Sequence, residues 1–314
     1  MKDIRQSVRV ALVTGAGSGI GRAVATALAR AGDIVYAGMR DIHGRNRQRG
    51  ADLLALARDE GLQLRLLELD VLSERSCRSA LDQLLLEQGR IDVVVNNAGM
   101  LMSGVTEAFT PEQVAQVIDT NALSWLRVNR AALPAMRRQG AGTLVYIGST
   151  TSRIHEPFLG PYVASKAAGD ALAEVMGFEV RPFGIDSIIV APGAFTRGTD
   201  HFNHAHGPAD GAVLEQYGSL PGRAAGLPAM LDAIDAACGG PLDVAAVGAA
   251  VRDVLAVAHG QRPARITVDA QHKGVEELDA LHQARQADFL TRMGLDDLLP
   301  ASARRSSHHH EAAQ

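Results

Sequence analysis

Cysteine is nearly absent from this sequence, and its scarcity excludes several kinds of protein. Only Cys77 and Cys238 occur among 314 residues, too far apart to form a metal or redox motif. So few cysteines suit a reducing compartment, and we expect a cytoplasmic protein. The net charge of −4 offers no footprint for nucleic acid. The first apolar run, residues 10–13, is too short for a signal segment or a membrane span, so we expect no membrane partner.

Lysine is also rare, and one lysine belongs to the most informative pattern. Most basic residues are arginine, whereas lysine occurs only at Lys2, Lys166 and Lys273. Lys166 follows Tyr162 by four residues, so the two side chains share one face if the segment is helical. An ammonium beside a phenol favours the phenolate and lowers its pKa from the ordinary value of about 10. Such a pair suits proton exchange near neutral pH.

A serine completes this constellation. Ser149 lies thirteen residues before Tyr162, at the end of the apolar run 143–148. Its hydroxyl can hold a carbonyl oxygen by a hydrogen bond, while the phenol passes a proton to or from that oxygen and a hydride moves on the carbon. By itself, a Tyr-x-x-x-Lys pair more often marks an exposed helix face. The interpretation therefore depends on the segments that precede it.

A glycine-rich turn near the start predicts a dinucleotide site. Residues 8–14 predict a buried strand and residues 22–30 a helix, which is the context that a phosphate-binding loop needs. The pattern is Thr14-Gly15-x-x-x-Gly19-x-Gly21, because Ile20 occupies the last glycine position of the usual fingerprint. The alternative is a glycine turn that binds no nucleotide. The cofactor-binding residues expected here are Thr14, Gly15, Gly17, Ser18, Gly19, Ile20 and Gly21.

The alternation of strands and helices continues and predicts an α/β fold. Further strands are expected at residues 33–39, 62–69, 91–95, 143–148, 185–190 and 265–268, and helices at 51–60, 74–88, 110–139, 161–181 and 243–259. We expect one doubly wound parallel sheet of the Rossmann type, with residues 1–268 as the dinucleotide-binding catalytic domain. Residues 194–240 are expected to form a substrate lid. Residues 269–300 predict a C-terminal helical extension, packed through Val275, Leu278, Leu281 and Leu290, and 301–314 a disordered tail that includes His308–His310.

The end of the second strand bears on the choice of cofactor. An NAD site usually has an acid there for the ribose 2′-hydroxyl, and we assign that position to Gly38. Arg40 follows and could clamp a 2′-phosphate, so NADP(H) is favoured. Asp41 lies nearby and keeps NAD(H) as an alternative. Three arginines at Arg45, Arg47 and Arg49 are most simply a solvated helix start.

Other strand ends add candidate cofactor contacts. Asp70, followed by Val71, could accept from an adenine amino group or cap the next helix. Asn96-Asn97-Ala98-Gly99 follows the fourth strand, at the edge where open α/β sheets bind ligands. The sixth strand runs into Pro192, Gly193 and, slightly later, Thr196.

In this order and spacing, the motifs resemble the short-chain dehydrogenase/reductase family over about residues 8–268. The segment 36–41 is similar to the second strand of its 17β-hydroxysteroid dehydrogenase-like branch. The resemblance implies that Tyr162 is the general acid/base, that Lys166 lowers its pKa and binds the nicotinamide ribose, and that Ser149 orients the carbonyl. It also implies a homodimer or homotetramer. The remaining implied contacts are a water held by Asn121, the cofactor at Asn96, Ala98, Gly99, Pro192 and Gly193, and the nicotinamide carboxamide at Thr196.

The expected function is interconversion of a ketone or aldehyde and an alcohol with NADP(H). Apolar residues at 100–102 and 157–159 suggest an apolar or amphipathic substrate, although such clusters are equally often core. Alternatives are an epimerase or dehydratase on the same fold and a redox-sensing regulator without turnover. His201, His204 and His206 lie in the lid without supporting cysteines or carboxylates, so no metal is expected.

Overall fold

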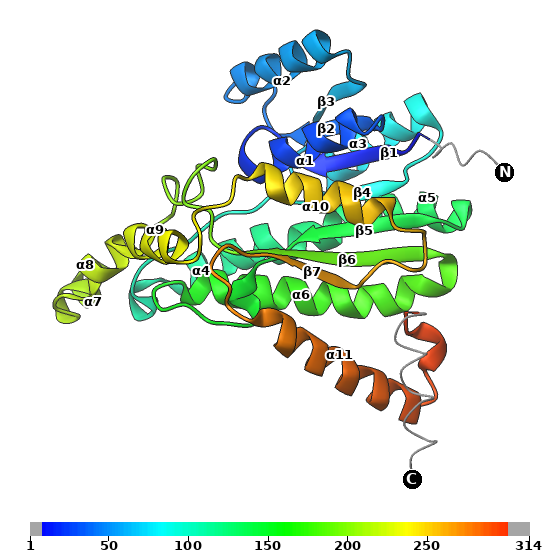
Figure 1. Ribbon diagram of the computed structural model, residues 1–314. Helices are drawn as coiled ribbons and strands as arrows, with labels where there is room; N and C mark the ends of the chain where they lie inside the picture. Colours follow the sequence, from blue (N-terminus) through cyan, green and yellow to red (C-terminus); the bar gives the residue numbers. More distant parts are fainter. Residues whose placement is uncertain (1–7, 301–314) are drawn as a thin grey trace.

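The computed structural model describes residues 8–300, and its centre is a parallel sheet of seven strands (Figure 1). The strand order is β3-β2-β1-β4-β5-β6-β7, which is the doubly wound arrangement predicted from the sequence. Strand bounds lie within two residues of those expected. The strands are β1 (Val10–Thr14), β2 (Ile34–Met39), β3 (Leu64–Glu68), β4 (Val93–Asn96), β5 (Gly142–Ile147), β6 (Ile185–Pro192) and β7 (Arg265–Val268).

Helices follow most of the strands and cover both faces of the sheet (Figure 1). The helix expected at 110–139 is divided by a π-helical turn, Asp119–Leu123, and its start at Pro111 is capped by Thr110 as expected. The helices are α1 (Gly19–Arg30), α2 (Arg47–Glu60), α3 (Glu74–Gln88), α4 (Pro111–Ile118), α5 (Ser124–Gln139), α6 (Gly160–Val180), α7 (Gly211–Gln216), α8 (Leu220–Ala225), α9 (Leu227–Ala237), α10 (Ala245–Ala256) and α11 (Val275–Arg292).

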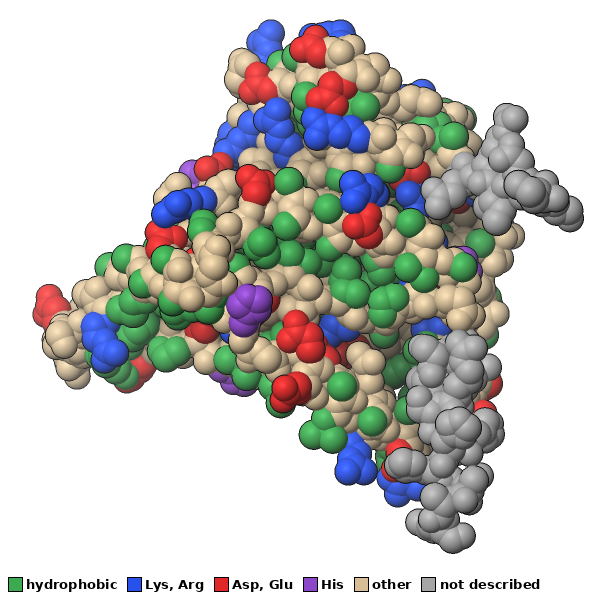
Figure 2. Space-filling view, viewed as in Figure 1, with side chains coloured by type: hydrophobic (Ala, Val, Ile, Leu, Met, Phe, Trp, Pro, Cys, Tyr) green, Lys and Arg blue, Asp and Glu red, His purple; other side chains and the backbone are tan. Residues whose placement is uncertain are grey.

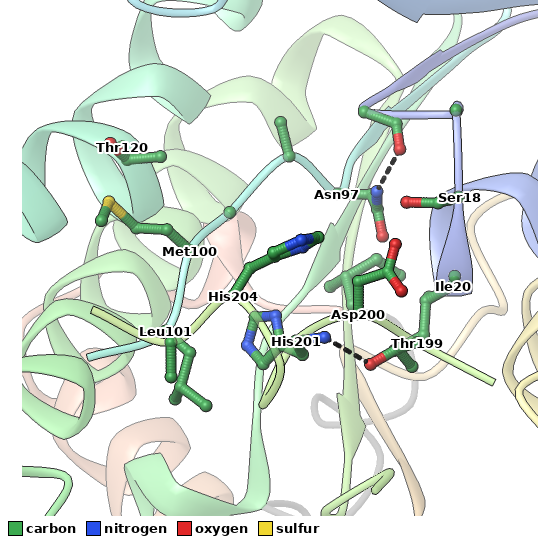
Figure 3. A pocket seen from close by; sticks show the side chains of 18 of the residues that line it. Ser18, Ile20, Asn97, Met100, Leu101, Thr120, Thr199, Asp200, His201 and His204 are labelled. Atoms are coloured by element: carbon green, nitrogen blue, oxygen red, sulfur yellow. Dashed lines mark hydrogen bonds between the residues drawn. The ribbon is translucent and has the colours of Figure 1, made fainter. Parts of the chain in front are cut away.

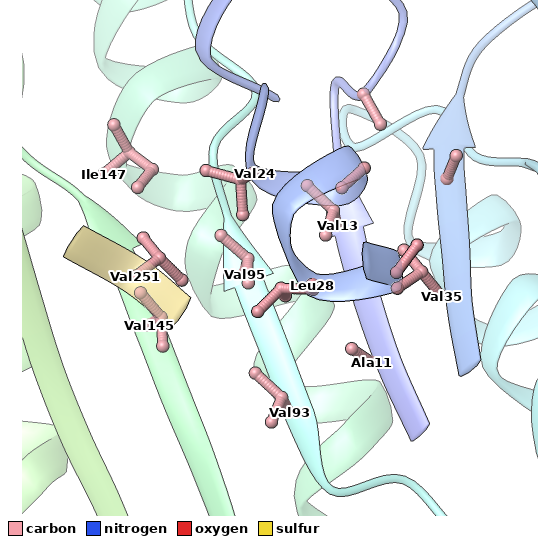
Figure 4. Packing of buried hydrophobic residues seen from close by; sticks show 14 of the residues in the cluster. Ala11, Val13, Val24, Leu28, Val35, Val93, Val95, Val145, Ile147 and Val251 are labelled. Atoms are coloured by element: carbon pink, nitrogen blue, oxygen red, sulfur yellow. The ribbon is translucent and has the colours of Figure 1, made fainter. Parts of the chain in front are cut away.

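The core lies in two layers, one on each face of the sheet. Successive strand residues point to opposite faces, so Val13 joins the layer under α1, α2 and α10 (Figure 4), whereas Leu12 joins the layer under α3, α5 and α6. Both residues are fully buried. This explains why the strands appear in the sequence as continuous apolar runs.

The functional edge of the sheet is set by its strand order. β1 pairs with β2 on one side and β4 on the other, so the chain winds away from β1 in both directions. The carboxyl ends of all seven parallel strands meet at one edge. Ligands of open α/β sheets bind at such a switch point.

Two segments lie outside the repeating pattern. Between β6 and α10, the segment predicted to be a lid contains α7, α8 and α9 (Figure 1). Helix α11 packs against the outside of α6, where Leu290 contacts Phe178. Contrary to expectation, Leu278 and Leu281 are exposed, while Asp279 is buried because arginines at the core bind its carboxylate.

Within residues 8–300, no helix is long and apolar enough to cross a membrane. The tail 301–314, including His308–His310, lies outside the described residues.

Candidate active site

A cavity of about 1150 Å³ runs along the carboxyl edge of the sheet, and we call it the groove. One end lies at the glycine turn after β1, near Ser18, and the other lies near Leu101 and His201 (Figure 3). Tyr162 lines this second end. Most of the expected site residues line it. They are Gly15, Gly17, Ser18, Gly19, Ile20, Gly21, Arg40, Asp70, Val71, Ala98, Gly99, Ser149, Tyr162, Lys166, Pro192 and Gly193.

The glycine turn fits a dinucleotide phosphate. Helix α1 begins at Gly19, and the side chain of its N-cap residue, Ser18, makes no capping hydrogen bond. The first amides of α1 therefore face the groove without a side-chain acceptor, at the positive end of the helix. A Cβ on Gly21 would lie 2.3 Å from the carbonyl oxygen of Gly15, so only glycine allows this tight turn.

Thr14 has a different place from the one expected. Its side chain is 1% exposed and does not line the groove. Its hydroxyl accepts hydrogen bonds from the backbone N–H of Asn97 and Ala98, at 2.9 and 3.0 Å. Thr14 therefore joins the ends of β1 and β4, because a hydroxyl can accept two bonds where these strand ends meet.

Asn96 was expected to contact the cofactor, but its neighbour Asn97 is the asparagine that lines the groove. Asn96 is buried and donates to Asn129 at 3.0 Å, so its side chain does not reach the groove. Asn97 lines the groove and donates to the carbonyl oxygen of Thr14 at 2.9 Å. Neighbouring residues at a strand end point in opposite directions, and the sequence assigned the wrong one of the pair.

Neighbouring residues also point in opposite directions at the end of β2. A Cβ on Gly38 would lie 2.8 Å from Leu69 Cδ2, so this position faces the core and not the groove. Met39 lines the groove and is the residue at the position where an NAD site would have its acid. Asp41 caps the next turn, since its carboxylate accepts from the backbone N–H of Arg45 at 2.8 Å.

Arginines surround this end of the groove. Arg40, Arg45 and Arg49 line it, whereas Arg47 is exposed outside it. Figure 2 shows basic side chains gathered on this face where α2 meets the rest of the chain. All three arginines lie at the solvated start of α2, as expected, and Arg45 and Arg49 in addition line the groove.

Asp70 lies at the end of β3 and lines the groove. One of its oxygens accepts from the backbone N–H of Leu72 at 3.0 Å, while Ser73 caps helix α3. The structure therefore separates the two alternatives for Asp70, because the cap of the following helix is a different residue.

The hydroxyl of Ser149 is oriented by its neighbour. It accepts a hydrogen bond from the hydroxyl of Thr151 at 2.9 Å and one from the Thr151 backbone N–H at 3.2 Å. With both bonds received, the Ser149 hydrogen is left to be donated toward the groove. The serine is 6% exposed, so this donor acts in a nearly dry site.

Tyr162 and Lys166 lie on consecutive turns of α6, as the spacing predicts. The ammonium Nζ lies 5.8 Å from the centroid of the phenol ring. Burial raises the pKa of Tyr162 above its usual value, and a hydrogen bond with Ser149 offsets part of this effect. The expected lowering by Lys166 is therefore not found in the chain alone, because desolvation of the phenolate is the larger effect.

Burial also acts on Lys166 itself. It lowers the pKa of Lys166 to about 8, although the negative charge of Asp170 opposes the change. Nζ donates to the carbonyl oxygen of Ile147 at 2.8 Å. The lysine is thus held at the end of β5 and can carry a proton or lose it near neutral pH.

Asn121 lies in the π-helical turn and uses its side chain within the protein. Its amide donates to the carbonyl oxygen of Met100 and to Ser165, both at 2.9 Å, and its oxygen accepts from the Met100 N–H at 2.8 Å. It therefore fixes the segment after β4 against α6. The water expected at Asn121 stays a prediction, and the carboxamide is already occupied.

Thr196 does not line the groove. Its hydroxyl donates to the carboxylate of Asp232 on α9, which turns it toward the lid helix. Thr199 lines the groove in its place. The contact expected between Thr196 and the nicotinamide carboxamide has no support from this geometry.

The segment expected to be a lid packs against Tyr162. Leu227 and Leu231 of α9 join Leu101 and Leu159 in an apolar cluster around the tyrosine. The ring of His201 meets the Tyr162 ring edge-on, with centroids 5.7 Å apart. Burial, and then the charge on Lys166, lowers the pKa of His201 to about 4. Among residues 8–300 no group of histidine, cysteine and carboxylate side chains could hold a metal ion.

A buried ion-pair cluster supports the Ser149 loop from behind. Arg265 pairs with Asp170 at 2.6 Å, and both side chains are almost fully buried. Arg153 pairs with Asp279 of α11 at 2.7 Å. The cluster ties β7, α6, α11 and the loop after Ser149 together, because each element contributes one charged group.

These motifs and this geometry match a known family. A family model described as short chain dehydrogenase matches residues 9–206. The chain belongs to the short-chain dehydrogenase family. It is accordingly an oxidoreductase of CH–OH and carbonyl groups that uses a nicotinamide dinucleotide.

Two curated short-chain dehydrogenases and one solved structure illustrate the similarity. The chain is 36% identical to 3-ketodihydrosphingosine reductase of Bacteroides thetaiotaomicron, over 62% of this chain and 67% of the relative. It is also 36% identical to human 17-beta-hydroxysteroid dehydrogenase type 1, over 59% of this chain and 56% of the relative. The structure of an actinorhodin polyketide ketoreductase variant with NADPH matches with a TM-score of 0.68 and 26% identity, over 83% of this chain and 95% of that one.

Proposed function

We propose that this short-chain dehydrogenase transfers a hydride between NADP(H) and a ketone or aldehyde, or the corresponding secondary alcohol, with Tyr162 as general acid/base. One observation carries the proposal: Ser149, Tyr162 and Lys166 line one end of a groove whose other end is formed by the glycine turn and arginines. When bound, the nicotinamide supplies or accepts the hydride, and its oxidised form adds positive charge beside the phenol.

Ser149, Tyr162 and Lys166 each have a separate role in the proton transfer. In the reducing direction, Ser149 donates a hydrogen bond to the carbonyl oxygen, and Tyr162 transfers its proton to that oxygen. Burial keeps the phenol protonated in the free protein, as the raised pKa of Tyr162 indicates. Lys166 lies close enough to favour the phenolate when the proton has left.

The preference for NADP(H) is supported by the end of β2. Met39 cannot accept from a ribose 2′-hydroxyl or repel a 2′-phosphate, and Asp41 is committed to capping a turn. Arg40 lines the groove close by. A charge-assisted hydrogen bond from arginine contributes roughly 1.5–3 kcal/mol, which corresponds to about a ten- to hundredfold preference. The solved relative with NADPH agrees with this choice, and NAD(H) remains the alternative that the measurement would reveal.

The substrate is proposed to be an amphipathic carbonyl compound. The walls around Tyr162 are apolar because they are made of Leu101, Leu159, Leu227 and Leu231. The groove also presents polar groups there, among them Glu156 and histidines of the lid. The substrates named for the two curated relatives, 3-ketodihydrosphingosine and 17β-hydroxysteroids, are both largely apolar molecules with polar groups.

The test is turnover followed at the NADPH absorbance. Purified protein would be offered a panel of apolar and amphipathic ketones with NADPH, and the matching alcohols with NADP⁺, alongside a binding titration with NADPH. Turnover of a carbonyl compound supports the proposal. Binding without any turnover would favour a redox-sensing regulator, and product formation without net consumption of cofactor would favour an epimerase or dehydratase.

We also propose a homodimer or homotetramer, as the family resemblance implies. Helix α6 exposes Leu172 and Val175, which a second copy could cover. Light scattering on the purified protein measures the assembly directly, and a monomer at micromolar concentration would contradict it.

A further inference from the structure

Residues 198–202, which we call the strap, touch three separate parts of the site. Thr199 packs against the glycine turn, since its Cβ lies 3.3 Å from the position of a Cβ on Gly19. Asp200 pairs with Arg49 of α2 at 2.9 Å. His201 meets the ring of Tyr162. Three consecutive residues, Thr199, Asp200 and His201, thus lie along the groove (Figure 3), from the glycine turn to the ring of Tyr162.

Arg49 lies at the place where a ribose 2′-substituent would be read. Its Cδ and the Sδ of Met39 both lie 3.6 Å from the position of a Cβ on Gly17. Met39 ends β2 and faces the groove, at the position that reads the ribose in dinucleotide-binding sheets. The side chain of Arg49 therefore lies beside the glycine turn and near Met39 at the ribose edge.

The partner of Arg49 has the chemistry of a phosphate substitute. Asp200 is an anion that the strap brings to the guanidinium from 151 positions away in the sequence. A carboxylate and a phosphate compete for the same donors, because both present oxygens to the planar N–H fork of arginine. Arg49 cannot bind both anions fully at once.

We propose that Arg49 binds the 2′-phosphate of NADP(H) and that Asp200 occupies Arg49 in the absence of the cofactor, so that the phosphate displaces Asp200 and releases the strap. This inference rests on the proposed use of NADP(H). Arg49 becomes a specificity-determining residue, and Asp200 becomes its internal competitor.

The relative strengths of the two pairs make the exchange favourable. The side chains of Arg49 and Asp200 are 43% and 44% exposed, and such a pair shifts an equilibrium by at most about fivefold. A 2′-phosphate carries nearly two charges and three acceptor oxygens, so its contact with arginine is worth about a ten- to hundredfold gain. NADH offers no such group at this position, so it leaves the pair intact.

The experiment compares NADPH and NADH affinities by fluorescence titration in four variants and the unmodified protein. Arg49→Gln should weaken NADPH about tenfold or more and leave NADH within about twofold. Asp200→Asn should tighten NADPH by up to about fivefold, because the competitor is gone. In the double variant, that gain should vanish. Arg47→Gln is the matched control, since Arg47 is on the same helix but outside the groove, and it should behave as the unmodified protein.

A second measurement follows the strap itself. Hydrogen exchange of the backbone amides in residues 199–202 should be faster in the NADPH complex than in the NADH complex of the unmodified protein. In Arg49→Gln the two complexes should exchange alike. This difference would not arise if the pair were merely structural.

Other outcomes overturn the inference in distinguishable ways. Equal loss of NADPH and NADH affinity in Arg49→Gln would show that Arg49 holds a group common to both cofactors. Weaker NADPH binding in Asp200→Asn would show that the carboxylate supports the cofactor instead of competing with it. In both cases, turnover with NADPH would leave the proposed function standing. A protein that binds neither dinucleotide would overturn both proposals.

Discussion

The ammonium of Lys166 donates a hydrogen bond to the backbone carbonyl oxygen of Ile147 at 2.8 Å. Ile147 is the last residue of β5 and precedes Ser149 by two positions. The bond therefore fixes helix α6, which carries Tyr162, against the strand that delivers the serine. The relative placement of the three groups follows from one contact between a side chain and a strand end.

Replacing Tyr162 by phenylalanine tests the proton-transfer role directly. Tyr162→Phe removes only a hydroxyl from a buried ring, so NADPH affinity should stay within about twofold. Turnover should fall by about 10²- to 10⁴-fold, the usual contribution of a positioned acid or base. The measurement is steady-state kinetics beside a fluorescence titration of the same preparation. Activity within tenfold of the unmodified protein would disprove the assignment.

Lys166 should impose a pH limit on carbonyl reduction. Its pKa is lowered to about 8 by burial, so the charged form is complete well below this pH and is lost as pH rises through it. The value of kcat/KM reports groups of the free enzyme, and it should decline above about pH 8. Lys166→Met should have low kcat/KM at every pH and lack this decline. If kcat/KM of the variant still declined above about pH 8, the decline would belong to another titrating group.

The cofactor preference should be reversible at Met39 and not at Gly38. Met39→Asp places a carboxylate at the ribose edge of the groove, so NADPH should weaken by at least tenfold and NADH should tighten. Gly38→Asp puts the same group against Leu69 in the core, where it should lower stability without a switch. Arg40→Ala should weaken NADPH selectively. The measurement is the ratio of the two dissociation constants, and a switch in Gly38→Asp would contradict the structure.

Sequence alone was sufficient for the sheet and for the placement of Tyr162 and Lys166 on one helix face, because both depend on local patterns. Apolar runs and glycine turns mark the parallel strands, and Tyr162 and Lys166 are placed by helical spacing within one element. At strand ends it failed by one residue: Gly38 was chosen where Met39 faces the groove, and Asn96 where Asn97 does. A shift of one position moves a side chain from one face of the strand to the other. The local sequence does not show which of two neighbouring residues faces the groove.

Contacts between distant segments could not be predicted for a different reason. Val275 and Leu290 of α11 are buried as expected, whereas Leu278 and Leu281 are exposed and Asp279 is buried. Its partners Arg153 and Arg265 come from other elements, so the sequence of the helix alone does not predict these ion pairs. The pairing of Arg49 with Asp200 is of the same kind.

The ion-pair cluster behind Ser149 should contribute strongly to stability. Arg265→Met leaves the buried carboxylate of Asp170 without its 2.6 Å partner, and breaking such a pair typically costs about 3–5 kcal/mol. Urea unfolding should show a loss of this size. Arg30→Met is the control, because Arg30 pairs with Glu60 at the surface and should cost at most about 1 kcal/mol. Equal losses of unfolding free energy in the two variants would show that burial does not strengthen the Arg265–Asp170 pair.

His201 should make stability depend on pH in a defined window. The pKa of its folded form is lowered to about 4, whereas an unfolded histidine titrates near 6.5. As pH falls from about 6.5 to about 4, His201 becomes protonated in the unfolded chain but stays neutral in the folded chain. The free energy of unfolding therefore decreases over this range. Below the folded pKa both states are protonated, and the contribution stops changing.

The test of this last prediction is a difference between two stability profiles. Urea unfolding of the unmodified protein and of His201→Asn would be measured from pH 7 to pH 4. The stability of the unmodified protein relative to the variant should decrease across the window by on the order of 1–3 kcal/mol. The reason is that histidine at position 201 can take up a proton, whereas asparagine cannot. If the two profiles ran parallel, the imidazole of His201 would not be held neutral against Tyr162.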